Sequence, residues 1–553
     1  MESLLVSARS TQLPSGRAPQ QREPPGVRYE IDCEPQLLPE ICGRLTGAHG
    51  FSFAGLVVEQ QPPEWGLRYL FYAPSGASFA RPEPCRLSAP PSAGELAAIA
   101  TGASWIHLIV RQPLARLAYP SISAEVHAAD WHEREVEDLF ELTFEGHPRL
   151  GDFVLHDDAW QEGLAPMRKE FDARSPPPER RPNTAWRPHR IVHEPGAFGM
   201  PIGPVYGGIC ESMHFLLETV GEDVIRALPR LFYKYRGVEK IAEGRPAADL
   251  LLLAERFNGI AAFAHGLACA QAIETIASIE PPMRAQVLRV ILAELERLRH
   301  HTGAIHDICE STSLTVAASQ AAILEEELLR LSGELTGHRY LFGLLAAGGL
   351  TRNFEDDSVR AMLQRALGIA HGLDRLERYL VKTSSFLDRL EEVGIITPAE
   401  ARTYGLVGPI ARASAFALDL RRAQPYADYG ACTFDVPQEQ EGDGYARLRV
   451  LFAEARQSAR IMQQAVAVLP GGAVRQASCE IPPGAALGWT EAPLGAAFHW
   501  VRTDERGRVS RYHIMPPSFV NWHGFHLAAE RFAFQDFPII LATFGLSVAE
   551  SDR

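Results

Sequence analysis

The sequence predicts a small α+β domain followed by a larger, mainly α-helical bundle domain with small β elements. Three observations support this fold class. Residues 28–171 alternate between strand-like and helix-like stretches, which is typical of α+β domains. Residues 172–195 are rich in proline and arginine, and are therefore expected to form a linker. In residues 196–553 the apolar side chains recur every three to four positions, which indicates packed helices.

The size and charge of the chain exclude several classes of protein. A chain of 553 residues exceeds one ordinary core, so we expect two or more domains. Its net charge of -14 argues against binding to nucleic acid or to an anionic membrane surface. No apolar run reaches the roughly 18 residues of a membrane span, so any membrane link should come through a partner. Residues 1–27 lack a long apolar segment and are expected to form a disordered tail rather than a signal peptide.

The eight cysteines are scattered and contain no C-x-x-C pair. We therefore expect free cytosolic thiols, without a disulfide framework or a cysteine-clustered metal site. The chain also contains no G-x-G-x-x-G motif, no phosphate-binding loop and no G-x-S-x-G motif. A dinucleotide site, a nucleotide phosphate site and a serine-hydrolase site are therefore not expected.

Strand and helix signals in the first domain are local and clear. Val, Phe, Leu and Tyr predominate in three expected strands: Gly50–Gln60, Leu67–Tyr72 and Trp105–Val110. Ser92–Ala100 is expected to form a short helix with a serine N-cap. Asp172–His189 contains five prolines, so it cannot form a helix or a central strand. An extended segment wrapped over the neighbouring domain explains that composition equally well.

The second domain is predicted to be a helix bundle with one β-hairpin. Two short strand-like runs around Asp504–Gly507 predict the hairpin. Apolar stripes that we interpret as bundle core lie in four segments: Pro282–His301, Ala321–Leu331, Ala361–Leu390 and Tyr445–Leu469.

The segment Ala254–Glu274 organises the second domain, because it is expected to form one helix with a buried face. Arg256 and His265 are polar residues on this helix, and a buried Arg or His needs a partner. The helix should therefore line a polar cavity or an interface. Asn258 and Ala261 are neighbours across one turn, where two thiolates could clamp a metal ion, but neither residue is a thiolate.

Three charged clusters have simple structural interpretations. Trp131–Phe140 is expected to form a solvated helix with charge pairs four residues apart. His300 and His301 are expected to be hydrogen-bonded interface histidines rather than metal ligands. Arg236 and Glu239 could pair across one helical turn, and a role in proton relay is the less favoured interpretation.

The motifs, taken in order, resemble a known family from about residue 30 onward. Ala129–Leu150, Leu155–Asp158 and Pro166–Phe171 resemble the 30-kDa subunit of NADH–quinone oxidoreductase (respiratory complex I). Later motifs resemble its 49-kDa subunit and the large subunits of [NiFe] hydrogenases. The fused arrangement is most similar to the large subunit of formate hydrogenlyase and related group 4 membrane-bound hydrogenases. The later motifs are Pro201–Pro204, Leu231–Glu243, Glu255–His265, Ile291–Gly303, Gly405–Ser414, Arg421–Tyr429 and Glu491–Gly495.

Departures from the family pattern affect the site that the resemblance implies. In such hydrogenases four cysteines hold nickel and iron, in R-x-C-G-x-C and D-P-C-x-x-C motifs. The corresponding positions here are Asn258, Ala261, Ser547 and Glu550. Nickel and low-spin iron need soft thiolates, so a [NiFe] site is not expected.

Further departures affect the neighbouring residues. Leu494 replaces the arginine of E-A-P-R-G. Tyr206 and Cys210 replace the two histidines of the complex I quinone site, and its tyrosine aligns with Gly259. A quinone bound in the complex I manner is therefore not expected.

The resemblance implies a peripheral subunit of a membrane-bound, complex I-like or hydrogenase-related redox complex. The protein would couple electron transfer in a partner to proton or ion translocation, without a Ni-Fe centre and without any cofactor of its own. Expected partners are a small iron–sulfur (20-kDa-subunit-like) protein, which would carry the cluster, and antiporter-like and quinone-site-like membrane subunits. This hetero-oligomer would lie on the cytoplasmic side of the inner (plasma) membrane.

Two alternatives remain open at the level of sequence. The chain could be an active NAD(P)H/quinone-type oxidoreductase subunit that reduces quinone in the vacated cavity. It could also be a non-catalytic assembly scaffold.

If the family fold is kept, the four vacated ligand positions should converge although Asn258 and Glu550 are far apart in sequence. Candidates for the polar cavity and a proton path are Glu239, Arg256, His265 and Glu550. A carboxylate facing this interior should be paired, and Arg256 is one candidate partner of Glu550. The alternative is a frayed tail in which Glu550 is solvated.

Overall fold

The structure of the chain is a computed structural model. It describes residues 27–74, 83–87, 91–160, 163–174, 183, 185–187, 190, 192–193, 195–205, 211–476, 480–530 and 532–553. Residues 1–26 of the expected tail and much of the expected linker at 172–195 lie outside these residues, so both remain predictions, while Val27 already belongs to the first strand. Tyr206 and Cys210 also lie outside them.

The N-terminal part is built on a five-stranded mixed sheet with the order β2-β3-β5-β1-β4. The middle strand β5 pairs parallel with β1 and antiparallel with β3. The three predicted strands and the predicted helix are confirmed, and Ser92 forms a capping box with Glu95. The elements of this part are β1 (Val27–Asp32), α1 (Leu38–Gly47), β2 (Ser52–Gln61), β3 (Glu64–Tyr72), β4 (Glu83–Leu87), α2 (Ala93–Gly102), β5 (Ala103–Pro113), β6 (Ala118–Pro120), α3 (Asp130–Phe140) and β7 (Thr143–Glu145).

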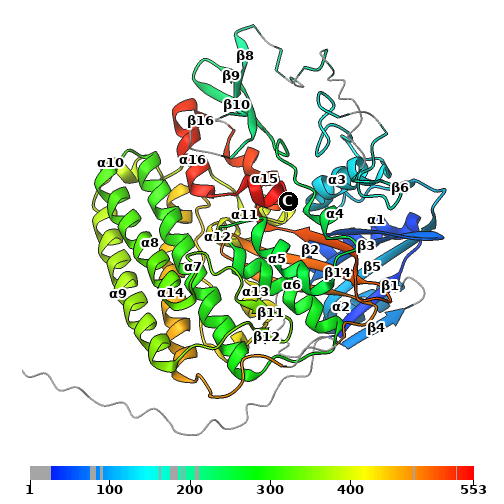
Figure 1. The fold of residues 1–553 in the computed structure, drawn as a ribbon. Coiled ribbons are helices and arrows are strands. Elements are labelled where there is room, and N and C mark those ends of the chain that lie inside the picture. Colours follow the sequence, from blue (N-terminus) through cyan, green and yellow to red (C-terminus); the bar gives the residue numbers. More distant parts are fainter. Residues whose placement is uncertain are drawn as a thin grey trace, which may run out of the picture.

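A bundle of long helices forms the opposite side of the molecule, as Figure 1 shows for α7, α8, α9 and α14. Their apolar stripes bury a common core that includes Leu295, Leu328 and Leu451, so the predicted bundle is confirmed. The helices are α7 (Met283–Ser311), α8 (Thr315–Thr336), α9 (Asp356–Leu380) and α14 (Gly444–Ala467), with the shorter α10 (Ser384–Leu387), α11 (Pro398–Thr403), α12 (Gly408–Ala413), α13 (Leu420–Ala423) and α16 (Phe537–Phe544).

A three-stranded antiparallel sheet lies between the N-terminal part and the helices. Its strands are β13 (Gly484–Ala492), β14 (Gly495–Thr503) and β15 (Val509–Met515), and the β14–β15 turn confirms the predicted hairpin. Side chains alternate along β14. Trp500 reaches the N-terminal part, where its Nε1 donates to Glu59 Oε1 (2.9 Å). His499 faces helix α6 (Ala262–Ile276) and contacts His265.

Two smaller sheets complete the fold. One has four strands in the order β16-β10-β9-β8 and lies at the top of Figure 1. The other pairs β11 with β12. Their bounds are β8 (Ala197–Ile202), β9 (His214–Val220), β10 (Asp223–Arg230), β11 (Leu345–Ala346), β12 (Gly349–Leu350) and β16 (Phe532–Ala533).

The segment Ala254–Glu274 forms two helices, so the prediction of one helix is wrong. Helix α5 (Leu250–Arg256) ends before Asn258, and α6 (Ala262–Ile276) begins after Ala261. Asn258 Oδ1 accepts from the Ile260 N–H (3.0 Å), a local turn that competes with the helix. Glu296 accepts from the N–H groups of Phe263 and Ala264, and so supplies the cap of α6 from another helix.

Helix α3 spans the segment Trp131–Phe140, which the sequence predicted to be a solvated helix. Its charged residues His132, Glu133 and Glu135 are buried. The prediction of a solvated helix is therefore wrong. The second part of the chain covers α3, since Trp131 stacks on His523 at 5.1 Å between ring centroids. Sequence spacing alone cannot show such coverage.

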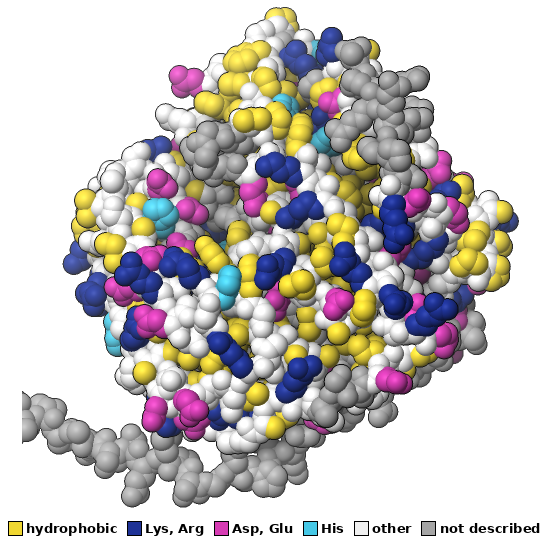
Figure 2. All heavy atoms as spheres, viewed as in Figure 1, with side chains coloured by type: hydrophobic (Ala, Val, Ile, Leu, Met, Phe, Trp, Pro, Cys, Tyr) yellow, Lys and Arg dark blue, Asp and Glu magenta, His cyan; other side chains and the backbone are white. Residues whose placement is uncertain are grey.

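Two further features of the described residues are the distribution of charge on the surface and the hydropathy of the helices. On the face in Figure 2, basic and acidic side chains are interspersed with hydrophobic ones. In the described part of the chain, no helix combines the length and the apolar character that crossing a bilayer requires.

Candidate functional site

Residues 547–553 pack into the centre of the molecule, close to the C label in Figure 1. Helix α17 (Val548–Ser551) begins at Ser547, whose Oγ accepts from the Glu550 N–H (3.1 Å). Asp552 accepts from the N–H groups of Phe232 (2.8 Å) and Lys234 (3.2 Å). Glu550 is fully buried, so the alternative of a frayed, solvated tail is wrong.

The carboxylate of Glu550 has three polar neighbours. Asn258 Nδ2 donates to Glu550 Oε1 (2.8 Å), and His265 Nε2 lies 2.8 Å from the same oxygen. The Ser518 N–H, in the first turn of α15 (Pro517–Ala528), donates to Oε2 (2.9 Å). A helix N-terminus favours a negative charge at this place.

The convergence expected of the vacated positions is therefore observed for Asn258, Ser547 and Glu550. Ala261 lies immediately before helix α6, and its backbone carbonyl accepts from the backbone N–H of His265 (3.1 Å). Three of the four residues that the resemblance places at ligand positions thus meet at one buried point.

A hydrogen-bonded chain of buried side chains starts at Glu550. His265 Nδ1 lies 2.9 Å from His499 Nε2, and His499 Nδ1 lies 2.7 Å from the Tyr512 hydroxyl. If Glu550 is ionised and both imidazoles are neutral, every proton position follows. Tyr512 donates to His499, His499 donates to His265, and His265 donates to Glu550. If Tyr512 passes its proton to His499, His499 passes one to His265 and His265 passes one to Glu550, then each of these hydrogen bonds reverses. Tyr512 must afterwards regain a proton from a further donor, and the relay moves no heavy atom far.

Burial controls the pKa values of His499 and Tyr512. It lowers the pKa of His499 well below the usual value, and the neighbouring His265 adds to the effect. Burial also raises the pKa of Tyr512 well above its usual value, and Cys269 and Glu239 act in the same direction. Neutral forms of His499 and Tyr512 are therefore favoured.

Glu239 lies in helix α4 (Val238–Ala242) and forms the second buried centre of the site. Arg511 Nη1 (2.9 Å), Arg553 Nε (3.0 Å) and the Ile514 N–H (2.9 Å) donate to its carboxylate, and His513 Nδ1 lies 2.9 Å away. Although burial alone would raise the pKa of Glu239, these cationic neighbours hold it well below its usual range. Glu239 is thus an ionised anchor for β15 and the tail.

Two predicted contacts do not form. Arg236 donates to the Ala549 carbonyl and not to Glu239, so the predicted ion pair is wrong. Arg256 is exposed and lies over the Phe342 ring (5.1 Å to the centroid), so it is neither on a buried face nor the partner of Glu550. The break between α5 and α6 turns Arg256 away from the site.

The prediction that His300 and His301 are hydrogen-bonded is confirmed, and both side chains are buried. His301 is fully buried and its Nε2 lies 2.8 Å from Glu454 Oε2, while His300 Nδ1 lies 3.3 Å from His301 Nδ1. Neither histidine belongs to the row of hydrogen-bonded side chains that begins at Glu550.

The residues that sequence reasoning missed lie on β14 and β15. The sequence pattern assigns His499, Tyr512 and His513 only to a hairpin. Alternation along the two strands could have placed His499 and Tyr512 on buried faces. No sequence signal pairs them with residues 265 and 550.

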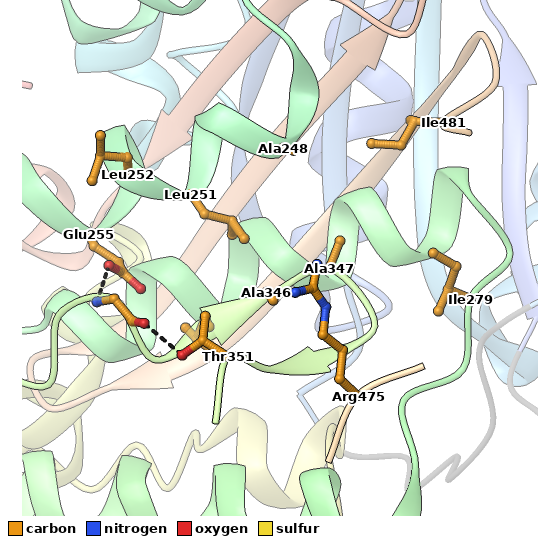
Figure 3. Close-up of a pocket in the computed structure, with 12 residues that line it drawn as sticks. Ala248, Leu251, Leu252, Glu255, Ile279, Ala346, Ala347, Thr351, Arg475 and Ile481 are labelled. Atoms are coloured by element: carbon orange, nitrogen blue, oxygen red, sulfur yellow. Dashed lines mark hydrogen bonds between the residues drawn. The ribbon is translucent and has the colours of Figure 1, made fainter. Parts of the chain in front are cut away.

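A cavity of about 300 Å³ lies elsewhere, between α5, the β11–β12 region and the segment around Arg475. Figure 3 shows Glu255 at one end, accepting from the Gly343 N–H (2.8 Å), and Thr351 donating to the Gly343 carbonyl (2.8 Å). None of Asn258, Ala261, Ser547 and Glu550 lines it. The predicted polar site and this cavity are therefore separate features.

Comparisons with known proteins agree with this architecture. The family model described as "Respiratory-chain NADH dehydrogenase, 49 Kd subunit" matches residues 313–481 and 473–553. The model "Respiratory-chain NADH dehydrogenase, 30 Kd subunit" matches residues 94–177, and "Nickel-dependent hydrogenase" matches residues 236–306.

Similar proteins cover most of the chain. Formate hydrogenlyase subunit 5 of Escherichia coli is 32% identical over 81% of this chain and 79% of its own length. The NADH-quinone oxidoreductase C/D subunit of Bdellovibrio bacteriovorus is 29% identical over 77% of this chain and 81% of its own length. Hydrogenase-4 component G of E. coli is 29% identical over 79% of this chain and 76% of its own length.

Fold and comparisons together define a large subunit of the oxidoreductase type, in which a 30-kDa-like part precedes a 49-kDa-like part. The chain belongs to the family of fused 30-kDa/49-kDa complex I subunits and large subunits of hydrogenase-4 and formate hydrogenlyase.

The side chains at the four positions that the resemblance assigns to metal ligands do not fit a nickel–iron centre. Asn258 offers an amide, Ala261 a methyl group, Ser547 a hydroxyl and Glu550 a carboxylate, and none is a soft thiolate. Three of them are already engaged with one another, through Asn258–Glu550 and Ser547–Glu550 hydrogen bonds. No step of the proposed mechanism therefore uses such a centre.

Proposed function

We propose that the chain is the peripheral large subunit of a membrane-bound, complex I-like or hydrogenase-related redox complex. It couples electron transfer in a partner iron–sulfur subunit to the movement of protons or other ions, and has no Ni-Fe centre of its own. Family membership supports the assignment to a redox complex. The relatives' names also favour a hetero-oligomer, which here includes a 20-kDa-subunit-like iron–sulfur protein and membrane subunits.

The observation that carries the coupling role is the buried chain Glu550–His265–His499–Tyr512. Its hydrogen bonds are all between 2.7 and 2.9 Å, and reversing them moves one proton equivalent along the chain. The resemblance places this carboxylate at a position where the related hydrogenases carry a metal ligand, so in this proposal Glu550 provides a titratable group there. Electron transfer nearby can then change the proton affinity of Glu550 by its electrostatic field.

Asn258 and Ser518 have positioning roles in this proposal. Their donors hold the Glu550 carboxylate, so its Oε1 stays directed at His265. Glu239 holds β15 through Arg511, His513 and the Ile514 N–H, and thereby fixes the strand that carries Tyr512.

Isolation of the complex from membranes, through an affinity tag on this chain, tests the assignment. We expect co-purification of an iron–sulfur protein and of membrane subunits, with electron transfer through the preparation by spectroscopic redox assay. Recovery of the chain without an iron–sulfur partner would contradict the proposal. Recovery of the partners without electron transfer would favour the assembly scaffold instead.

A further inference from the structure

A second group of charged side chains lies buried where the helix bundle meets β13. None of its members is more than 2% exposed, and each has a charged atom within 4.0 Å of another member. They come from α7, α12, α14, β13 and the beginning of α13. We call these residues the buried ion cluster: Glu294, Arg297, His301, Arg412, Asp419, Arg421, Glu454 and Glu491.

Two arginines hold the buried ion cluster together. Arg421 donates to Asp419 Oδ2 (2.6 Å) and to Glu294 Oε1 (3.0 Å). Arg412 donates through Nε to Glu454 Oε1 (2.5 Å) and through Nη1 to Glu491 Oε1 (2.8 Å). Arg297 lies 3.6 Å from Glu294 and 3.9 Å from Glu454.

The charges of the cluster do not balance. Four carboxyl groups face three guanidinium groups, which leaves one negative charge when all are ionised and His301 is neutral. An uncompensated charge in a protein interior is costly, and a buried group normally takes up a proton instead. The other titratable groups that face the cluster, Tyr72, Tyr426, Tyr429 and His300, are uncharged in their usual forms and cannot cancel it.

We propose that the buried ion cluster is a binding site for one proton, with Glu491 as its principal holder and His301 as the alternative holder. This inference concerns the charge balance of the chain itself. It goes beyond the proposed function and holds whether or not the chain couples electron transfer.

Hydrogen-bond geometry selects Glu491 among the four carboxyl groups of the cluster, because each of the other three has a second side-chain donor. For Glu454 the two partners are Arg412 Nε and His301 Nε2. Asp419 receives Arg421 Nε and Nη2, and Glu294 receives Arg421 Nη1 together with the Tyr429 hydroxyl (2.5 Å). Glu491 receives only one guanidinium N–H, from Arg412 Nη1, which also donates to the Leu418 carbonyl. Its other oxygen accepts from the Leu420 N–H (2.9 Å).

The electrostatic surroundings act in the same direction. Burial and the negative charge of Asp419 raise the pKa of Glu491 above its usual value. Burial also opposes ionisation of Glu454, but Arg412 and His301 outweigh it and hold the pKa of Glu454 well below its usual range. Of these two carboxyl groups on Arg412, Glu491 is therefore the one that keeps a proton.

His301 offers the alternative position. As an imidazolium it would donate through Nε2 to Glu454 and through Nδ1 to His300. Burial lowers the pKa of His301, so this form is the minor one at rest. His300 also lines a cavity of about 10 Å³ beside Leu494 and Phe544, which is at the lower limit for one water molecule. A proton could reach the cluster from that side.

Infrared spectroscopy of the purified full-length chain at pH 8, in H₂O and D₂O, tests the proposal. The wild-type-minus-E491Q difference spectrum should contain the C=O band of one protonated carboxyl group, while other buried carboxyl groups cancel. The exposed control E505Q should give no such band. Glutamine is uncharged like protonated glutamate, so the melting temperature of E491Q should lie well above that of E454Q.

The variant E454Q gives a more specific test in the same infrared experiment, because it leaves three carboxylates and three guanidinium groups in the cluster. The extra proton is then no longer needed, so the Glu491 band should vanish although Glu491 is still present. D419N, which removes one charge at another place, should give the same result. An E491Q difference spectrum without the band, a band retained in E454Q, or a melting temperature of E491Q as low as that of E454Q would overturn the proposal.

Discussion

Arg553 and Glu239 lie 314 residues apart in the sequence and form a buried ion pair, with Arg553 Nε donating to Glu239 Oε1 at 3.0 Å. Arg553 also donates to Glu135 in helix α3. The pair therefore joins three parts of the chain: the N-terminal part, helix α4 and the segment that carries Glu550. The position of Glu550 depends on this anchorage.

Replacing Arg553 by alanine should lower the free energy of unfolding by about 3 kcal/mol, because it leaves buried carboxylates without a cationic partner. Urea unfolding of the purified chain measures the change. R506A, in the exposed turn between β14 and β15, is the matched control and should have little effect. A loss for R553A no larger than that of the control would show that the pair does not hold the tail.

The ionisation of Glu239 predicts the pH dependence of stability. Its folded pKa lies well below the ordinary 4.5, so ionised Glu239 stabilises the fold fully above about pH 4.5. That contribution is lost as the pH falls toward the folded pKa. The difference in free energy of unfolding between wild type and E239Q should therefore be largest near pH 7 and shrink below pH 4.5. A difference that stays constant or grows on acidification contradicts this assignment.

Gly488 allows β13 to approach helix α6. A Cβ at this position would lie 1.9 Å from the Ala268 carbonyl oxygen, and the nearby atoms are backbone that cannot turn away. G488A should therefore destabilise the chain by about 3 kcal/mol, as overpacked cores do. Gly471 has no atom within 4 Å of the corresponding point, so G471A should be near neutral. Equal melting temperatures for the two variants would show that the sheet and helix are not in this contact.

Local patterns predicted much of the fold, because strands, bundle helices and the Asp504–Gly507 hairpin depend on alternation and periodicity within a short window. The errors arose where distant residues decide. Helix α3 looked solvated because the part of the chain that covers it comes nearly 400 residues later. Asn258 and Glu296 divide a continuous apolar pattern into two helices, and Glu296 belongs to another element.

The residues of the candidate site also fall into two groups, those that the sequence indicated and those that it could not. The resemblance pointed to Asn258, His265 and Glu550, and the structure places these three side chains in contact. His499 and Tyr512 could not be paired with them from sequence, because the pairing depends on how the β14–β15 hairpin packs on α6. Arg256 was misplaced for the same reason, since the turn after α5 directs it to the surface.

Metal content gives a prediction that is independent of stability. Because an amide, a methyl group, a hydroxyl and a carboxylate occupy the four vacated positions, the chain should contain no stoichiometric nickel or iron. Elemental analysis of the anaerobically purified chain, separated from its partners, measures this directly. About one nickel per chain, together with hydrogen uptake, would contradict this prediction.

The most direct test of the central claim is the rate of ion translocation by the intact membrane complex carrying E550Q. Glutamine keeps the shape of the carboxyl group, and its one carbonyl oxygen can still accept from Asn258. Assembly and electron transfer should therefore persist, but glutamine cannot take up the proton from His265. We expect translocation to fall about a hundredfold, in line with the loss of a positioned acid–base group, while the exposed control E505Q behaves as wild type. Unchanged translocation in a fully assembled E550Q complex would contradict the claim that Glu550 carries protons.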